Sequence, residues 1–445
     1  MNTPICDFVS EYMRTQAVRL HMPGHKGQPL LGMESLDITE IDGADVLYSA
    51  NGIISESMEN ARRLFKSGRT LYSTEGSSLS IRAMLYLASL WGQSAGKDRL
   101  VLAGRNAHRV FHSAAALLDL DVKWLYGNKG GLMRCDISPD TLQKALSECD
   151  RKPFAVYLTS PDYLGNMLDI GALSEICKRH GVLCLVDNAH GAYLNFLKDS
   201  LHPISLGAHM CADSAHKTLP ALTGAGYLHI SADVPREISE QADIGMALFA
   251  STSPSYLILQ SLDAVNKYLD EDYSEKLSAL CGGVFALRSR LTEKGYKLIG
   301  DEPIKLTVDA KAYGYYGYDL AKRLSERNIV CEHVDRDVIV LMLTPQTSED
   351  DLARLEAALL SVNKKAPIVE IPPMPLVGER VLTVREATLF PKERLSVKDA
   401  VGRILADSAV SCPPAVPIAV CGERVTENTL ALFEYYGIDT VYVVK

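Results

Sequence analysis

The sequence predicts an α/β protein built around a mostly parallel sheet. Short apolar segments of strand length alternate with segments of helical periodicity through the middle of the chain. Four of the expected strands are residues 99–103, 122–126, 154–158 and 182–186. Three expected helices between them are residues 110–118, 141–149 and 173–180. Apolar strands separated by helices form parallel sheets that are covered on both faces.

Other segments predict further parts around this sheet. Residues 1–60 look irregular apart from an amphipathic stretch at 8–20. The elements expected later are a long helix from 256 to about 292, strands at 296–299, 304–308 and 338–342, and a helix at 350–360. A proline-rich joint at 371–375 marks a boundary. The four expected parts are an N-terminal segment 1–60, a large domain 61–292, a small α/β domain 293–370 and a C-terminal domain 371–445.

Composition narrows the functional classes. The 445 residues are 47% hydrophobic and 23% charged, which is ordinary for a soluble globular protein. The net charge of −9 argues against nucleic acid as a partner, because phosphate binding needs a basic surface. Ten scattered cysteines show no zinc-site spacing, so we expect reduced thiols and no metal. With neither a signal peptide nor an 18-residue apolar run, we expect a cytoplasmic protein that does not bind membranes.

Polar residues follow several of the expected strands, at the edge where parallel sheets bind ligands. His108, the turn at 160–163, Asp187 with His190, and the His216-Lys217 pair all lie at such strand ends. A buried lysine with a lowered pKa is the usual group for an imine with a carbonyl cofactor. Alone, the Ser-Ala-His-Lys pattern is weak evidence, because most lysines are solvated surface residues. The convergence of polar residues at one edge is the stronger argument.

A second pattern predicts a phosphate site. Gly76, Ser77 and Ser78 open a segment of helical periodicity, and a helix N-terminus offers backbone N–H groups to an anion. An ordinary helix cap explains the same residues equally well.

Together these residues have the properties of a pyridoxal phosphate site. That cofactor needs an imine lysine, a carboxylate at its pyridine nitrogen, a flat group over its ring and a phosphate cup. Lys217, Asp187, His108 and the segment 76–78 would fill these roles in chain order. Ala189 is small enough to let the ring lie against the backbone.

The sequence resembles the bacterial ornithine/lysine/arginine decarboxylases of fold type I, in their short form without an N-terminal wing domain. The resemblance spans nearly the whole chain. It rests on segments 21–27, 39–43, 76–78, 105–108, 187–191, 214–218 and 252–256 and on the region of Cys412, Pro413 and Pro414. It implies an aspartate-aminotransferase-like fold with a mostly parallel seven-stranded sheet, a small α/β domain and a C-terminal appendage.

The resemblance also implies roles for individual residues. The catalytic residues would be Lys217, which forms the imine, with Asp187, His108, His190 and His216. The cofactor-binding residues would be Gly76, Ser77, Ser78, His108, Asp187, Ala189, Ser214, His216, Lys217, Ser251 and Thr252. Ser251 or Thr252 would reach the phosphate from the other subunit of a homodimer, and either His216 or Lys217 could return a proton to Cα. Glu332 would face the distal amine of the substrate, although an exposed loop carboxylate explains it equally well.

The expected reaction is decarboxylation of a basic amino acid, arginine or lysine before ornithine, to a polyamine precursor. Some positions depart from the family pattern: Asn188, Asp162, Leu79 and the segment 44–49. The changes near 45 and 162 concern the substrate. An aminotransferase or aldolase-type enzyme would share every cofactor residue, although no arginine can be assigned to clamp a substrate carboxylate. A catalytically inactive regulatory homologue is a third possibility, against which the intact Lys217 argues.

Overall fold

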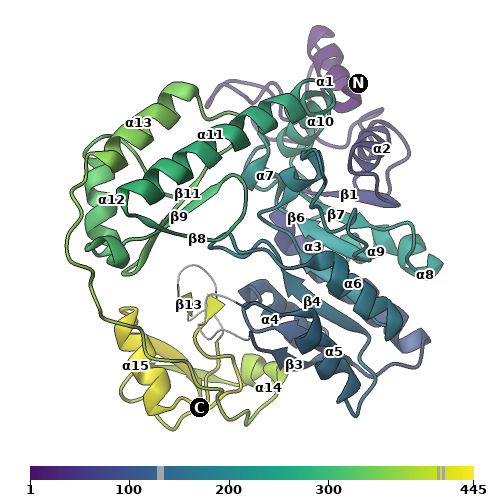
Figure 1. Cartoon of the computed structure of the whole chain (residues 1–445). Coiled ribbons are helices and arrows are strands. Elements are labelled where there is room, and N and C mark those ends of the chain that lie inside the picture. The colour runs from purple at the N-terminus through teal and green to yellow at the C-terminus, as the bar shows by residue number, and fades with distance from the viewer. Residues whose placement is uncertain (128–134, 408–410, 413–415) are drawn as a thin grey trace. The chain divides into compact units, whose positions relative to one another are not determined.

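The computed structural model describes residues 1–127, 135–407, 411–412 and 416–445. Pro413 and Pro414 of the C-terminal motif lie outside the described residues, whereas Cys412 is placed as backbone only. The chain divides into two compact units (Figure 1). The first unit comprises Met1–Lys97 and Cys177–Lys276, and the second comprises Asp98–Ile176 and Leu277–Lys445. The bounds of the four expected domains stay a prediction.

The first unit contains four strands of the main sheet and the helices that surround them. Its strands are β1 (Arg69–Ser73), β5 (Leu183–Asp187), β6 (Met210–Asp213) and β7 (Gly226–Ile230). Its helices are α1 (Pro4–Arg14), α2 (Ile53–Phe65), α3 (Gly76–Ser94), η1 (Ala192–Phe196), α7 (Ala215–Thr218), α8 (Arg236–Glu240), α9 (Ala242–Ala247) and α10 (Tyr256–Asp270). Two helices cross the unit boundaries, α6 (Ile170–Arg179) and α11 (Tyr273–Lys294).

The second unit contains the other strands of the main sheet and the smaller sheets. Its strands are β2 (Leu100–Gly104), β3 (Asp121–Leu125), β4 (Ala155–Thr159), β8 (Lys297–Ile299), β9 (Lys305–Asp309), β10 (His333–Val334), β11 (Val338–Met342), β12 (Lys392–Ser396), β13 (Ser411–Cys412), β14 (Val416–Pro417) and β15 (Thr440–Val444). Its helices are α4 (Arg109–Leu117), α5 (Pro139–Ser147), η2 (Lys311–Tyr313), α12 (Gly317–Ser325), α13 (Glu349–Leu360), α14 (Val384–Leu389) and α15 (Glu427–Tyr435).

The main sheet has seven strands in the order β1-β7-β6-β5-β4-β2-β3. The pairs β2–β3, β2–β4 and β5–β6 are parallel, whereas β7 runs antiparallel to β6 and to β1. Every residue of β2, β5 and β7 is buried, because these strands are apolar on both faces. The predicted mostly parallel α/β sheet is confirmed.

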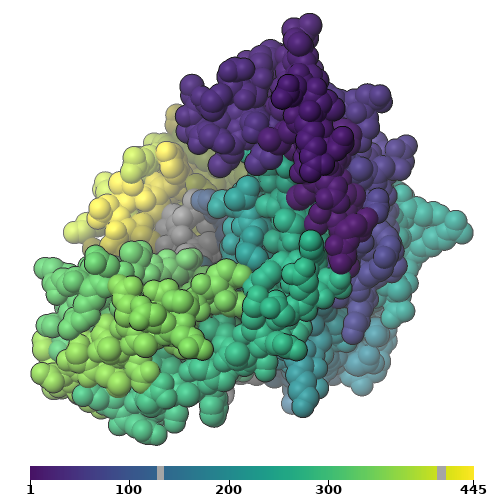
Figure 2. All heavy atoms as spheres, turned by 90° about the horizontal axis from the view of Figure 1, so that it is seen from above, coloured from purple at the N-terminus to yellow at the C-terminus, as the bar shows by residue number. Residues whose placement is uncertain are grey.

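The N-terminal segment contains more helix than its sequence predicts. Helix α1 is shorter than the expected stretch at 8–20, and the expectation of irregular structure is wrong for α2. The carboxylate of Asp45 accepts backbone N–H bonds from Gly52 and Ile54 at 2.9 and 3.0 Å, so it caps α2 from seven residues before Gly52. Such a distant cap has no local sequence signature. Figure 2 shows the N-terminal residues, in purple, at the molecular surface.

The expected long helix at 256–292 is two helices. Helix α10 ends at Asp270, and α11 begins at Tyr273. Glu271 interrupts the helical hydrogen bonds, since its backbone angles are φ −85° and ψ −119°. Within the part of the chain that the structure describes, no helix is long and apolar enough to cross a bilayer.

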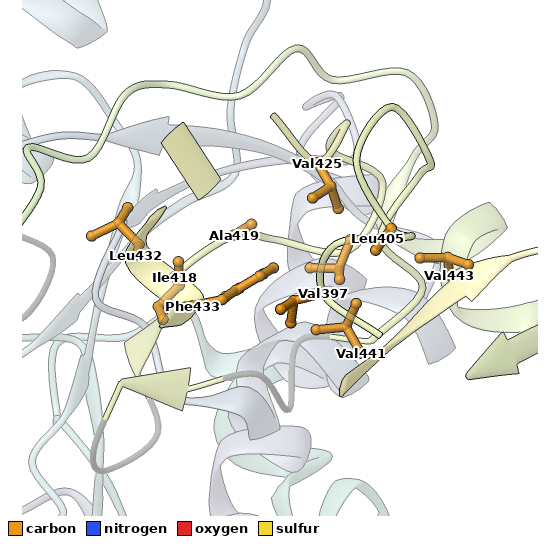
Figure 3. Packing of buried hydrophobic residues seen from close by; sticks show 10 residues of the cluster. Val397, Leu405, Ile418, Ala419, Val425, Leu432, Phe433, Val441 and Val443 are labelled. Atoms are coloured by element: carbon orange, nitrogen blue, oxygen red, sulfur yellow. The ribbon is translucent and has the colours of Figure 1, made fainter. Parts of the chain in front are cut away.

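The small sheet and the C-terminal region each have a core of their own. Strands β10, β11, β9 and β8 form an antiparallel sheet in that order. Strands β8, β9 and β11 lie within one residue of the predicted strands, whereas β10 was not predicted. Antiparallel strands β12 and β15 cover a separate hydrophobic cluster (Figure 3). Its buried members are Val397, Ala400, Leu405, Ile418, Ala419, Val425, Leu432, Phe433, Val441 and Val443.

Candidate active site

The turn between β1 and α3 is built for close backbone approach. Gly76 adopts φ +65°, and its N–H donates to the carbonyl of Gly224 at 2.6 Å. Ser73 donates through its hydroxyl to the carbonyl of Gly76 at 2.7 Å. A Cβ on Gly226 would lie 2.8 Å from the carbonyl carbon of Gly76, so only glycine fits there. The start of α3 is therefore held against the segment that leads into β7.

This turn brings together two hydroxyls that the sequence assigned to a phosphate. The Ser214 hydroxyl, just after β6, donates to the Ser77 hydroxyl at 2.8 Å, and both residues are buried. The N-cap position of α3 is Glu75, which makes no side-chain cap bond. The helix-cap interpretation of residues 76–78 therefore gains no support. Two hydroxyls and the first N–H groups of a 19-residue helix thus lie together, in a cradle of donors of the kind that binds anions.

Lys217 lies in α7, directly after β6. Its Nζ is hydrogen-bonded to His190 Nε2 at 3.2 Å, which places two predicted catalytic residues in contact. Lys217 is half-buried, whereas His190 is buried. The convergence predicted between the ends of two neighbouring strands is thus present in the first unit.

His216 has a defined tautomer. Its Nδ1 lies 2.8 Å from the carbonyl of Ala225, which can only accept, so Nδ1 carries the proton. Burial lowers the pKa of His216, the bond to Ala225 opposes this, and the positive charge of Lys217 lowers it further. The ring is therefore neutral at physiological pH and presents Nε2 as a proton acceptor.

Asp187 ends β5 beside β6, opposite Ala212 in the parallel register. Its carboxylate is buried, and Oδ1 accepts a weak bond from the Ala189 N–H at 3.3 Å. Gly191 completes the tight turn, since a Cβ there would lie 2.0 Å from Asn188 Oδ1. The strand end therefore presents a carboxylate followed by a compact turn.

Ser251 and Thr252 are exposed, as residues that serve a neighbouring subunit would be. The Ser251 N–H donates to Glu75 Oε1 at 2.7 Å, so its own chain already holds this loop beside the start of α3. The predicted contribution of these residues to the other subunit's phosphate site stays a prediction. Ser78 is half-buried in the first turn of α3.

The remaining predicted residues lie in the second unit. His108 is the N-cap of α4, where its Nδ1 accepts from the Val110 N–H at 3.2 Å. Glu332 is exposed, and its Oε1 accepts from the Tyr163 hydroxyl at 2.8 Å. Glu332 also lines a cavity of about 570 Å³ together with Asp351 and Arg354. Most other residues of its lining are apolar or uncharged, including Ile329, Leu341 and Leu343.

Asp162, which departs from the family pattern, is bound within its own turn. Its carboxylate accepts from the N–H groups of Leu164 and Asn166, both at 2.9 Å, and from the Asn166 side-chain amide at 2.8 Å. Burial raises the pKa of Asp162 to about 6, against the lowering effect of Asn166 and Lys305. These contacts favour a structural role for this carboxylate.

The sequence did not single out the buried polar network around Asp213. This residue contacts Asn188, His202 and His229. The sequence feature that could have revealed this network is Asp213 itself, a charged residue at the end of an apolar strand, just before Ser214. Tyr163 was also missed as the partner of Glu332, because 169 residues separate the two in the chain.

Comparisons with known proteins agree with this geometry. Residues 3–291 match the family model described as Orn/Lys/Arg decarboxylase, major domain, and residues 383–439 match the C-terminal domain of the same family. The chain is 28% identical to the uncharacterized protein YaaO of Bacillus subtilis, over 97% of this chain and 93% of that protein. It is also 28% identical to an arginine decarboxylase of Bacillus subtilis, over 96% of this chain and 92% of the relative.

Solved structures show the same fold. The lysine decarboxylase of Francisella novicida superposes with a TM-score of 0.79 at 15% identity, covering 100% of this chain and 81% of that one. Lysine decarboxylase A of Pseudomonas aeruginosa gives a TM-score of 0.80 at 16% identity, covering 99% and 80%. The predicted aspartate-aminotransferase-like fold of type I is confirmed. Matches to both family domains, in the expected order, show that the chain belongs to the Orn/Lys/Arg decarboxylase family.

Proposed function

We propose that this member of the family uses pyridoxal phosphate to decarboxylate a basic amino acid, arginine or lysine before ornithine. The observation that carries the proposal is the contact of Lys217 with His190 at 3.2 Å, at a strand end next to the one that presents buried Asp187. Arginine stands first because the curated relatives that match over nearly the whole chain include arginine decarboxylases.

The residues of the first unit fit the cofactor. Lys217 offers the amine for a covalent bond, Asp187 offers a buried carboxylate for the pyridine nitrogen, and the cradle of Ser77 and Ser214 offers donors for the phosphate. When bound, pyridoxal phosphate supplies the electron sink that makes loss of CO2 possible. His108 is proposed to cover the ring.

The chain's own residues then control protons and orientation. Asp187 would hold a proton at the pyridine nitrogen. Burying a charged carboxylate is unfavourable unless a positive charge lies beside it, and the protonated nitrogen would supply that charge. His216, neutral with its proton on Nδ1, would present Nε2 near Lys217. His190 would orient the Lys217 amine through their hydrogen bond. Either His216 or Lys217 would return the proton to Cα after CO2 departs.

Glu332 is proposed to bind the distal cation of the substrate. A carboxylate attracts both a guanidinium and an ammonium group, so Glu332 explains basic substrates without choosing between them. The Tyr163 hydroxyl restricts the orientation of this carboxylate at 2.8 Å. The choice between arginine and lysine would then depend on the length of the site.

We further propose a cytoplasmic homodimer. The described cysteines are all free thiols, which suits a reducing compartment. Several apolar side chains of the N-terminal segment are almost fully exposed, including the adjacent Leu30 at 91% and Leu31 at 85%. Adjacent exposed apolar residues favour burial against another chain. A second copy is the proposed partner, because Ser251 and Thr252 are exposed beside the cradle.

A substrate panel tests the proposal. Purified protein with pyridoxal phosphate is given arginine, lysine or ornithine, and both CO2 and the product amine are measured. We expect equal amounts of CO2 and amine from one basic amino acid, and neither product with Lys217→Ala. Formation of a keto acid without CO2 would move the reaction to transamination. Cofactor binding without any turnover would favour a regulatory protein.

A further inference from the structure

A buried carboxylate joins the two strand ends that carry the proposed catalytic residues. Asp213, the last residue of β6, is completely inaccessible to solvent. Its Oδ1 accepts from the Asn188 side-chain amide at 2.8 Å, and its Oδ2 accepts from His202 Nε2 at 3.0 Å. Asn188 directly follows Asp187, and Asp213 directly precedes Ser214. One side chain thus connects the carboxylate strand end to the segment that leads to the lysine.

A third group extends this network across the sheet. His229 on β7 places Nε2 at 3.4 Å from Asp213 Oδ2, and its Nδ1 is hydrogen-bonded to Thr70 on β1 at 2.8 Å. Burial raises the pKa of Asp213, but His202 and His229 outweigh this effect and hold it below its usual range. The carboxylate is therefore charged at neutral pH, in a site with no access to water.

Metal binding is the competing interpretation of this cluster. His202, Cys211 and Asp213 have ligand atoms within 4.8 Å of one another. The His202–Asp213 separation of 3.0 Å is an ordinary hydrogen bond, whereas two ligands on tetrahedral zinc lie about 3.3 Å apart. Burial and Asp213 both raise the pKa of the Cys211 thiol, and zinc binds the thiolate. A hydrogen-bond network explains the cluster better.

We infer that Asp213 is a positioning residue, which fixes the turn after Asp187 relative to the segment that carries Ser214 and Lys217. The inference rests on the proposed function and adds to it a residue outside the reacting groups. A carboxylate suits the position because it has two acceptor oxygens and must receive two donors. Asn188 and His202 supply these donors, so the two segments are held by one rigid group.

While the Asn188 amide keeps its present orientation, with Oδ1 against Gly191, an amide at position 213 cannot make both contacts. It has one acceptor oxygen, and its NH2 group would face either the Asn188 amide or the His202 N–H as donor against donor. His202 Nδ1 makes no hydrogen bond among the described residues, which agrees with a proton on Nε2. Moving that proton to Nδ1 would create a buried donor without a partner. Asp213→Asn therefore either breaks the connection at one of its two ends or turns the Asn188 amide over, which puts an NH2 group against Gly191 in place of Oδ1.

Exchanging the two groups restores the connection. In the double variant Asn188→Asp/Asp213→Asn, the amide oxygen accepts from His202 and the amide NH2 donates to the carboxylate at position 188. The single variant Asn188→Asp places two carboxylates in contact and should fail. Asp263→Asn is a matched control, because Asp263 is also a buried carboxylate of the first unit. It accepts from the N–H groups of Ile5 and Cys6 at 2.9 and 3.0 Å.

The experiment compares these variants as full-length, cofactor-loaded protein. We expect Asp213→Asn to lower kcat by about tenfold to a hundredfold, with KM changed by less than about threefold, because small misplacements of catalytic groups cost rate. The pH midpoint of the visible absorption band should shift as well. The double variant should recover kcat to within about threefold of wild type. Asp263→Asn should lower the melting temperature and leave the band and kcat unchanged.

The alternatives give different results. If wild type decarboxylates and Asp213→Asn matches it in kcat and spectrum, the inference is wrong while the proposed function stands. If kcat falls equally in Asp213→Asn, in the double variant and in Asp263→Asn, Asp213 contributes only to the stability of the fold and is not a positioning residue. About one equivalent of zinc in purified wild type, lost in Cys211→Ser, would replace the network with a metal site. If wild type shows neither a visible band nor CO2 release, the proposed function itself fails.

Discussion

The surroundings of Lys217 and of Glu332 differ in how firmly the fold holds them. Around Lys217, its partner His190 and the nearby strand-end residues Asp187 and Ser214 are buried, and the turns in this region admit only glycine at key points. Glu332 is exposed, and within the described part of the chain its carboxylate has one side-chain partner, Tyr163. A buried, well-connected frame suits chemistry that is common to a family. An exposed carboxylate with one restraint suits a feature that differs between substrates.

The largest effect should follow from removing the lysine of the firmly held region. Lys217→Ala should lower kcat by about a thousandfold or more and abolish the visible absorption band, because it removes the amine proposed to bond to the cofactor. Steady-state CO2 release and an absorption spectrum measure both effects. Lys267→Ala, which removes an exposed lysine of α10 in the same unit, should behave as wild type. A Lys217→Ala protein that keeps its band would contradict the assignment.

A second prediction concerns pH and Asp162, which holds the turn before Tyr163. The folded protein keeps the Asp162 proton up to a pKa of about 6, whereas the ordinary value is 3.8. The folded state therefore binds more protons between these values, and stability falls as the pH rises through this window. The total loss is on the order of 3 kcal/mol. Denaturant unfolding at several pH values should show this fall in wild type and not in Asp162→Asn.

Substitutions at the less restrained region should change binding more than rate. Glu332→Gln should raise KM for the basic amino acid by about tenfold to a hundredfold, because a charge-assisted bond is lost, and should change kcat little. Tyr163→Phe removes only the restraint on that carboxylate and should raise KM less. Steady-state kinetics with the preferred substrate separate the two constants. An unchanged KM in Glu332→Gln would show that Glu332 is an exposed loop carboxylate that does not bind the substrate.

The smallest expected effect is at the cradle. Ser77→Ala removes one of two hydroxyls and should weaken pyridoxal phosphate binding by about tenfold, since helix N–H groups remain. Ser80→Ala is the control in the same helix, because the buried Ser80 hydroxyl has no hydrogen bond among the described residues. Titration of apoprotein with the cofactor measures both. Equal weakening in the two variants would indicate general damage to α3.

Sequence reasoning found what depends on local pattern. The apolar strands and the polar residues at their ends predicted the sheet and the convergence of Lys217 and His190 at one of its edges, although not their hydrogen bond. Helix α2 was missed because its cap, Asp45, is remote in sequence, and the break at Glu271 has no glycine or proline to mark it. The network of Asp213 could not be predicted, since tertiary folding alone brings its partners together.

The departures from the family pattern also become clearer with structure. Asn188 donates to Asp213, and Asp162 and Asp45 bind backbone N–H groups of nearby turns. These residues maintain local structure, so the proposed control of substrate choice rests on Glu332. Sequence alone could not separate these roles, because a carboxylate that caps a turn and one that binds a cation look alike.

The most direct test of the central claim is to trap the covalent bond between the protein and its cofactor. Protein loaded with pyridoxal phosphate is reduced with borohydride, digested and mapped by mass spectrometry. We predict a pyridoxyl modification on the peptide that contains Lys217. Modification of a different lysine, or of none in protein that releases CO2, would contradict the account.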